Sequence, residues 1–275
     1  MAKAPQLKTA VCEMTSTDNW STNVAMALER LSRIPSSFQP DFVSFPENSL
    51  YLRLSEGEKC QFVGIEDAVF DSLKKWAKDH GCVLHLGSVP LKGNGFQYNA
   101  TVLIEADGSI KSVYNKMHLF DVDIQGHRSY RESDIFKHGE EPSIIEVKGW
   151  KIGLTICYDL RFSELFHYYG RREVDVIAVP SAFTVPTGKA HWEVLLRARA
   201  IENQCYVLAA AQQGQHNAKR ETYGHSLIVD PWGVIEGEAT PSMPVITSTL
   251  EQEKLTQVRI QIPMKNHRKK LSTFE

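Results

Sequence analysis

The sequence has 275 residues, of which 42% are hydrophobic and 23% are charged, and this composition is typical of a globular protein rather than a disordered one. Its 31 Lys and Arg residues are offset by 33 Asp and Glu residues, and the resulting net charge of −2 argues against a nucleic-acid partner. The one basic cluster, at residues 265–270, is interpreted as a solvated C-terminal tail.

The cysteine content and the first residues indicate the cellular compartment. The sequence does not open on an apolar stretch typical of a signal peptide, and no apolar run approaches the ~20 residues of a membrane helix. The number of cysteines is odd and none forms a CxxC pair, which argues against a disulfide framework and a zinc knuckle. We therefore expect a cytoplasmic protein without membrane contact, in which any special cysteine is catalytic rather than structural. The five are Cys12, Cys60, Cys82, Cys157 and Cys205.

Strand-like and helix-like segments alternate through the first half of the chain. Helices are predicted over residues 23–34, where apolar side chains recur on one face, and over residues 62–80, with Gly81 as the C-cap. Residues 106–108 (Ala-Asp-Gly) are a turn signal and predict a hairpin. The predicted strands are residues 8–14, 41–45, 82–89, 98–104 and 110–114.

The second half repeats this alternation, with a second hairpin predicted at Lys148-Gly149-Trp150 and a turn at residues 230–233. Helices are predicted over residues 163–169, with Ser163 as N-cap, and over residues 190–204 and 250–257. No linker, repeat or low-complexity segment divides the chain, so we predict one α/β domain over residues 1–275 with mixed sheets. The predicted strands are residues 144–147, 152–157, 174–180, 205–211, 226–229 and 258–262.

Two of the apolar strands lead into reactive side chains. Residues 42–45 lead through a proline to Glu47, and residues 152–156 lead directly to Cys157. Ligands of α/β sheets gather beyond the carboxyl ends of strands, so both residues are candidates, although a buried free cysteine is usually inert. Lys116 follows a hairpin strand and alone reads as a surface lysine. Together the three supply a thiol, a base and a positive charge for a developing oxyanion.

Competing sites have less support. The segment Gly224-His225-Ser226-Leu227 lacks the second glycine of a nucleophile elbow, and the chain has no P-loop and no dinucleotide-binding fingerprint. The ten histidines lack H-E-x-x-H spacing, so no metal and no cofactor are expected. A Cys–His dyad through His118 or His191 remains an alternative.

Three segments of the chain resemble the catalytic blocks of the nitrilase, or carbon–nitrogen hydrolase, superfamily. They are Phe45-Pro46-Glu47-Asn48, residues 115–121 (NKMHLFD) and residues 156–162 (ICYDLRF), which occur in the same order as in the family and with similar spacing. The resemblance implies a four-layer α-β-β-α sandwich that forms a homodimer or a higher homo-oligomer, with one helical layer buried between subunits.

The resemblance also implies roles for the reactive side chains. Glu47 would be the general base, Cys157 the nucleophile, and Lys116 the group that stabilises the tetrahedral intermediate. Glu132 matches a second glutamate that family members carry between the lysine and the cysteine. The implied enzyme forms a cysteine thioester and needs neither a metal nor a cofactor.

The substrate is implied by segments of the second half. Residues 180–193 resemble the Nit-type amidases, and residues 194–214 and 223–233 are most similar to the branch that acts on deaminated glutathione. This small-molecule amide would be cleaved to 2-oxoglutarate and cysteinylglycine, a metabolite-repair reaction. The alternatives are an ω-amidase acting on 2-oxoglutaramate, another small-amide or N-carbamoyl hydrolase, and a non-catalytic interaction module. The four intact catalytic side chains argue against the last.

Substrate contacts are predicted at two places. The backbone N–H of Tyr158, beside the nucleophile, is an expected oxyanion donor. Ser181, Ala182 and Phe183, at the carboxyl end of a predicted strand, are expected to contact the substrate. An anionic substrate also needs a cation, and the candidates are Arg161, Arg197 and Arg199, each of which could instead be a structural ion-pair residue. Residues 49–58 match the branch poorly, so substrate preference is expected to depend on them.

Overall fold

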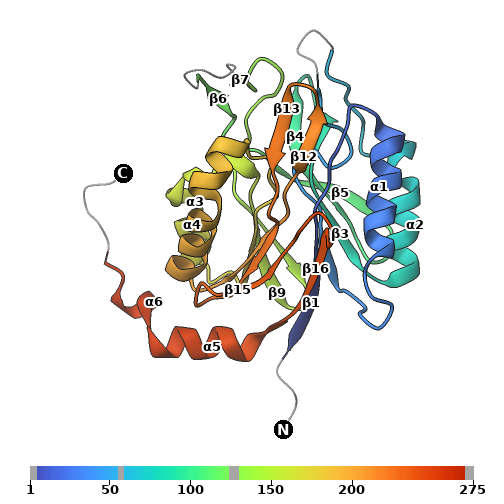
Figure 1. Cartoon of the computed structure of the whole chain (residues 1–275). Coiled ribbons are helices and arrows are strands. Elements are labelled where there is room, and N and C mark those ends of the chain that lie inside the picture. Colours follow the sequence, from blue (N-terminus) through green and yellow to red (C-terminus); the bar gives the residue numbers. More distant parts are fainter. Residues whose placement is uncertain (1–4, 55–58, 124–129, 270–275) are drawn as a thin grey trace.

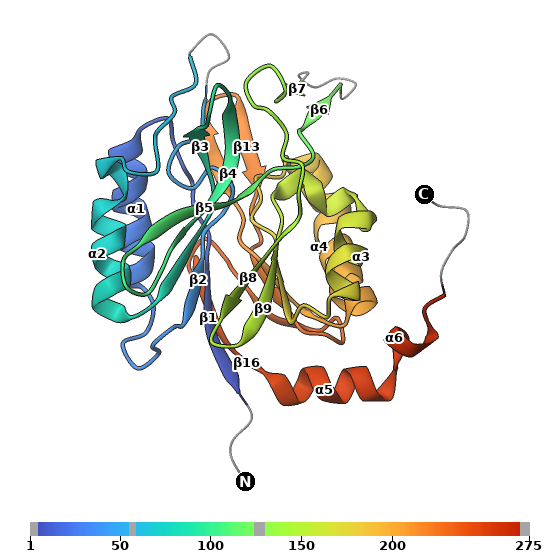
Figure 2. The same cartoon turned by 180° about the vertical axis from the view of Figure 1, so that it is seen from behind.

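The computed structural model describes residues 5–54, 59–123 and 130–269, and within them two six-stranded sheets lie face to face. A pair of helices covers the outer face of each sheet, which gives four layers in the order α-β-β-α (Figures 1 and 2). The predicted sandwich with mixed sheets is therefore confirmed.

The first sheet has the strand order β16-β1-β2-β3-β4-β5. β1, β2 and β3 are parallel, and the other neighbouring strands are antiparallel. β2 lies between β1 and β3, and all three of its residues are buried. The hairpin predicted at residues 106–108 joins β4 to β5. The strands are β1 (Gln6–Cys12), β2 (Phe42–Ser44), β3 (Val83–Lys92), β4 (Gln97–Ile104), β5 (Ile110–Asn115) and β16 (Val245–Glu251).

The second sheet has the order β15-β14-β11-β10-β9-β8, with β9, β10 and β11 parallel at its centre. The predicted hairpin at Lys148-Gly149 joins β8 to β9, and both residues have positive φ (49° and 80°), as a tight hairpin turn requires. The strands are β8 (Ser143–Val147), β9 (Trp150–Leu154), β10 (Val176–Ala178), β11 (Tyr206–Ala209), β14 (Leu227–Val229) and β15 (Ile235–Glu238).

Two helices cover each sheet because each has an apolar face to bury. α1 (Trp20–Ser32) and α2 (Asp71–His80) lie on the first sheet, and α3 (Ser163–Arg171) and α4 (Val185–Asn203) lie on the second (Figure 1). One hydrophobic core joins α1 and α2 to the first sheet, and a second fills the space between the sheets and under α3 and α4. Each fully buried large apolar side chain contributes about 1.5–3 kcal/mol to the stability of this arrangement.

Several predicted boundaries are wrong. The helix expected over residues 62–80 begins only after the 3₁₀ turn η1 (Ala68–Phe70), because Val63 pairs with Leu91 at the edge of β3 instead. α2 does end at Gly81, whose φ of 60° permits the left-handed cap. α3 begins without a side-chain cap from Ser163, and α4 begins five residues earlier than predicted, with a proline in its first turn.

The strand predicted over residues 258–262 is instead the end of helix α5 (Gln252–Gln261). Its β-branched residues favour a strand by propensity, but Leu255 and Val258 are both buried at helical spacing against the body of the protein. The last strand of the first sheet, β16, was not predicted, since the polar run Thr247-Ser248-Thr249 hides its alternation.

The remaining described elements are short. Two small hairpins, β6 (Asp121–Val122) with β7 (Tyr130–Arg131) and β12 (Gln213–Asn217) with β13 (Arg220–Tyr223), lie at one end of the sandwich (Figure 1). η2 (Cys157–Arg161) precedes α3, and α6 (Met264–His267) follows α5. No helix in the described part of the chain is long and apolar enough to cross a membrane.

Candidate active site

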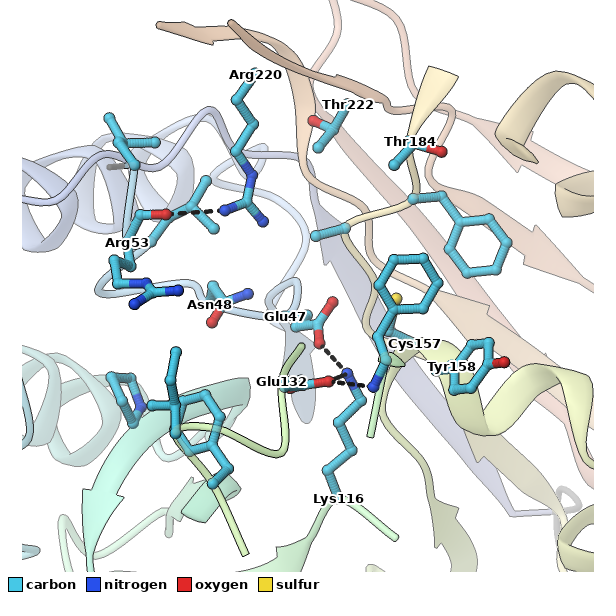
Figure 3. A pocket seen from close by; sticks show the side chains of 18 of the residues that line it. Glu47, Asn48, Arg53, Lys116, Glu132, Cys157, Tyr158, Thr184, Arg220 and Thr222 are labelled. Atoms are coloured by element: carbon cyan, nitrogen blue, oxygen red, sulfur yellow. Dashed lines mark hydrogen bonds and ion pairs between the residues drawn. The ribbon is translucent and has the colours of Figure 1, made fainter. Parts of the chain in front are cut away.

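Three strands from both sheets deliver the predicted reactive residues to one place. Glu47 lies three residues beyond the end of β2, Lys116 directly follows β5, and Cys157 lies three residues beyond the end of β9. All three side chains line a single pocket, and Glu132 lies on its wall (Figure 3). The structure therefore brings together the four residues that the sequence singled out.

Lys116 is the centre of a buried ion-pair network. Its Nζ donates to Glu47 Oε1 at 2.8 Å and to Glu132 Oε2 at 2.7 Å (Figure 3). Only 2% of its surface is exposed, and burial by itself lowers the pKa of Lys116. The carboxylates of Glu132 and Glu47 outweigh that effect and raise the pKa well above the ordinary value, so the ammonium stays charged.

Asn99, a residue that the sequence analysis missed, joins the two carboxylates. Its Nδ2 donates to Glu132 Oε1 at 2.8 Å and to Glu47 Oε1 at 3.2 Å, and the N–H of Phe120 donates to Glu132 Oε2 at 2.7 Å. Its position in the buried strand β4 could have indicated a role for Asn99, because a buried polar side chain needs a hydrogen-bond partner.

Cys157 occupies a strained turn at the start of η2. Its φ is 48°, a left-handed conformation that costs a residue with a side chain about 1–3 kcal/mol unless its surroundings hold it. Its own N–H donates to Pro180 O at 2.8 Å, which ties the turn to the end of β10. This conformation turns the thiol out of the sheet and into the pocket.

The surroundings of Cys157 favour the protonated thiol. The Glu47 carboxylate and the backbone of Ala182 line the same pocket, and both act on the pKa of the thiol. Burial raises the pKa of the Cys157 thiol well above its usual range, and the charge of Glu47 raises it further, while Lys116 opposes both. A base within hydrogen-bond distance is therefore required to release the sulfur as a nucleophile.

The predicted substrate contacts divide into two groups. Tyr158, Ala182 and Phe183 line the pocket. Ser181 does not, because it is fully buried in the strand edge, where its N–H donates to Ala210 O and its hydroxyl donates to Val179 O.

The three candidate arginines differ in their positions and partners. Arg161 lines the pocket and lies over the rings of Phe183 and Tyr158, with centroid distances of 5.3 and 5.9 Å. Arg199 donates twice to Leu160 O, and Arg197 donates to Gly233 O, so both have structural partners. The sequence analysis missed four further pocket cations, which are Arg53, Arg131, Lys219 and Arg220.

The competing histidine sites find other partners. His118 Nδ1 lies 2.6 Å from Asp159, and His191 Nδ1 lies 3.2 Å from Arg161, so neither is placed as a base for Cys157. Among the described residues, no group of three or more His, Cys, Asp or Glu side chains is arranged to hold a metal ion.

This fold and this set of buried side chains are those of a carbon–nitrogen hydrolase. Residues 8–260 match the family model described as carbon–nitrogen hydrolase, and the chain belongs to that family. It is therefore an enzyme of the amidase type, as predicted.

Similar proteins indicate which branch of the family this chain resembles. A protein of Yersinia enterocolitica named deaminated glutathione amidase is 35% identical over 270 residues, which cover 96% of this chain and 94% of that protein. A protein of Synechocystis sp. with the same name is 39% identical over 265 residues, which cover 94% and 97%. The crystal structure of the Caenorhabditis elegans NitFhit protein superposes with a TM-score of 0.85 at 35% identity over 98% of this chain. This chain spans 66% of that structure's length. The predicted nitrilase fold is confirmed.

Proposed function

We propose that this amidase hydrolyses deaminated glutathione to 2-oxoglutarate and cysteinylglycine through a thioester on Cys157. The observation that carries the chemistry is the pocket shared by the Cys157 thiol and Glu47, a carboxylate that is already paired with the Lys116 ammonium. The names of the relatives, which cover nearly the whole chain, support the substrate.

The first step is attack on the amide carbonyl. Both hydrogen bonds from Lys116 and Asn99 fall on Glu47 Oε1, and in Figure 3 the second oxygen of Glu47 lies on the side of the Cys157 sulfur. That oxygen takes the thiol proton as the sulfur bonds to the carbonyl carbon, and the carbonyl electron pair moves to oxygen. The third N–H of the Lys116 ammonium and the N–H of Tyr158 then hold the oxyanion.

The second step breaks the C–N bond. Glu47 returns its proton to the leaving nitrogen, the electron pair of the oxyanion reforms the carbonyl, and the amine departs from a thioester. Glu47 then takes a proton from water as the water attacks the thioester, and the Cys157 sulfur leaves and recovers its proton. Glu132 keeps Lys116 charged and in place throughout, since it accepts one of the three ammonium protons.

The charges of the pocket suit this substrate, which has carboxylates on both sides of the amide that is cleaved. Arg161 lies beside Tyr158, on the side of the thiol. Arg53 and Arg220 lie on the opposite side of Glu47 and direct their guanidinium groups into the pocket, where Arg220 also donates to Arg53 O at 2.8 Å (Figure 3). We propose that the 2-oxo-acid end faces Arg161 and that the glycine carboxylate faces Arg53 and Arg220.

Hydrolysis assays with deaminated glutathione and 2-oxoglutaramate test this proposal, with Cys157→Ala as the control. We expect kcat/KM for deaminated glutathione to exceed that for 2-oxoglutaramate at least about 10-fold, because only the first substrate reaches both groups of cations. Its cleavage should release cysteinylglycine without ammonia. A preference for 2-oxoglutaramate, or cleavage no faster than with Cys157→Ala, would overturn the assigned substrate.

We also propose that the chain is a single-domain protein that acts in the cytoplasm as a homodimer. Val194 and Ile201 on α4 are 68% and 48% exposed, and Trp232 and Val234, in the turn that packs on Ile201, are about half exposed. An exposed apolar patch of this kind is typical of a subunit interface. Light scattering at several protein concentrations should give a dimer or a higher homo-oligomer, and a strict monomer would refute the proposal.

A further inference from the structure

A fully buried carboxylate, Asp159, joins the lysine segment to the turn that carries the thiol. Its Oδ2 accepts hydrogen bonds from the Tyr114 hydroxyl at 2.7 Å and from the Ile156 N–H at 2.8 Å. Its Oδ1 accepts from the His118 N–H at 3.0 Å and lies 2.6 Å from His118 Nδ1. Each oxygen therefore has two partners, and together they come from both sheets.

The positions of these partners are informative. Tyr114 lies two residues before Lys116 and His118 lies two residues after it, while Ile156 directly precedes Cys157. One carboxylate thus holds the chain on both sides of the lysine and also the residue before the nucleophile. The ring of His118 stacks on Phe162 at 3.7 Å, which holds the lysine segment against the far end of η2 as well.

The proposed mechanism depends on the position of Lys116 relative to Cys157. The oxyanion forms on a substrate bonded to Cys157, whereas its charged donor stands on a separate segment in the other sheet. A displacement of about 1 Å between such groups can cost about 100-fold in rate. The left-handed φ of Cys157 adds a second demand, because such a turn persists only when neighbouring contacts hold it.

We propose that Asp159 is a positioning residue, which holds Lys116 in register with Cys157 so that the ammonium meets the oxyanion as it forms. The inference rests on the proposed thiol mechanism but not on the identity of the amide. Asp159 touches neither the substrate nor the reacting atoms and acts through Tyr114, His118 and Ile156. Burial, and then the charge of Asp159, raise the pKa of Tyr114 well above 10, so its hydroxyl donates over the whole working pH range.

A matched pair of tyrosine variants tests the proposal. Tyr169 is fully buried, and its hydroxyl donates to Leu154 O and accepts from the Ser143 N–H, so it bonds β8 and β9 rather than Asp159. Tyr114→Phe and Tyr169→Phe each delete one buried hydroxyl. We expect Tyr114→Phe to lower kcat about 10-fold and leave KM within about 2-fold, whereas Tyr169→Phe leaves both unchanged.

Asp159→Asn should have a larger effect, a fall in kcat of about 100-fold at nearly constant KM, because all four contacts weaken together. If that variant does not fold, the tyrosine pair still decides the matter. Equal kcat values for Tyr114→Phe and Tyr169→Phe would overturn the positioning role. They would mean that the loss of a buried hydroxyl has the same effect on catalysis whether or not the hydroxyl is bonded to Asp159.

Alkylation with iodoacetamide separates this inference from the choice of substrate. The Cys157 thiolate displaces iodide from the reagent, and Lys116 favours that thiolate. Alkylation of Cys157, followed by peptide mass spectrometry, should slow in Tyr114→Phe and Asp159→Asn but not in Tyr169→Phe. That pattern without hydrolysis of deaminated glutathione would refute the proposed substrate and support the positioning role. Alkylation at one rate in all variants would refute the positioning role itself.

Discussion

Replacing Lys116 by methionine tests how the buried network is held together. Methionine keeps an unbranched apolar stem but removes the ammonium, which lies 2.8 Å from Glu47 and 2.7 Å from Glu132 and is 2% exposed. At these distances and an effective dielectric constant of about 20, Coulomb's law gives an attraction of about 6 kcal/mol for each pair. Desolvation of the three charges opposes this attraction, and breaking such a buried pair from one side costs about 3–5 kcal/mol net.

We therefore expect Lys116→Met to lower the free energy of unfolding by about 3–5 kcal/mol near neutral pH and to lower kcat at least about 1000-fold. Without the ammonium, the two carboxylates are expected to share a proton as the pH falls, and that proton stabilises the folded state. The loss of stability should accordingly shrink near pH 5.

Urea denaturation at both pH values measures the effect, with Lys75→Met as the matched control. Lys75 forms a surface ion pair with Asp79 at 2.6 Å on α2, and its loss should leave the free energy of unfolding close to that of the wild type. The reasoning would be refuted by a loss in Lys116→Met below about 1 kcal/mol, or by an equal loss at both pH values.

Three further predictions concern charge. Glu47→Gln removes a negative charge that raises the pKa of Cys157, so thiolate absorbance should appear at lower pH than in the wild type although kcat collapses; an unchanged titration would contradict this. Arg53→Gln should raise KM for deaminated glutathione about 10-fold and leave KM for 2-oxoglutaramate unchanged, since only the first substrate carries the glycine carboxylate; equal effects would refute the placement. Burial raises the pKa of Glu13, so folding favours its neutral form and stability is lost as the pH rises through the folded-state pKa. Glu13→Gln should raise the thermal midpoint by about 2–4 °C near pH 8 and by less near pH 5, and the reverse order would contradict this sign.

The extent to which the sequence predicts this fold differs between its elements. The buried central strands and the two hairpins are predicted because apolar runs and turn residues are local signals. β16 and the true end of α5 were missed because their structure depends on distant partners. β16 pairs along its whole length with β1, and Gln204 Nε2 donates to the Val258 and Ile262 carbonyls at the end of α5.

The same limit applies to the site. Glu47, Lys116 and Cys157 could be predicted because each stands in a segment with a recognisable pattern. Asn99 and Asp159 could not be assigned roles, since their side-chain partners lie tens of residues away in sequence and come close only in the folded protein. The pocket cations other than Lys116 and Arg161 were missed because charge alone does not distinguish them from surface residues.

The pairing of β16 with β1 has a consequence for how the protein is made. Gln6 is hydrogen-bonded to Glu251, which lies 245 residues further along the chain, so β1 has no partner on this side until β16 has been synthesised. Until then, one edge of the nascent sheet presents seven residues of unpaired, largely apolar strand. Synthesis interrupted before residue 245 should therefore yield fragments that aggregate, and cells that make this enzyme in quantity would need a chaperone to shield that edge.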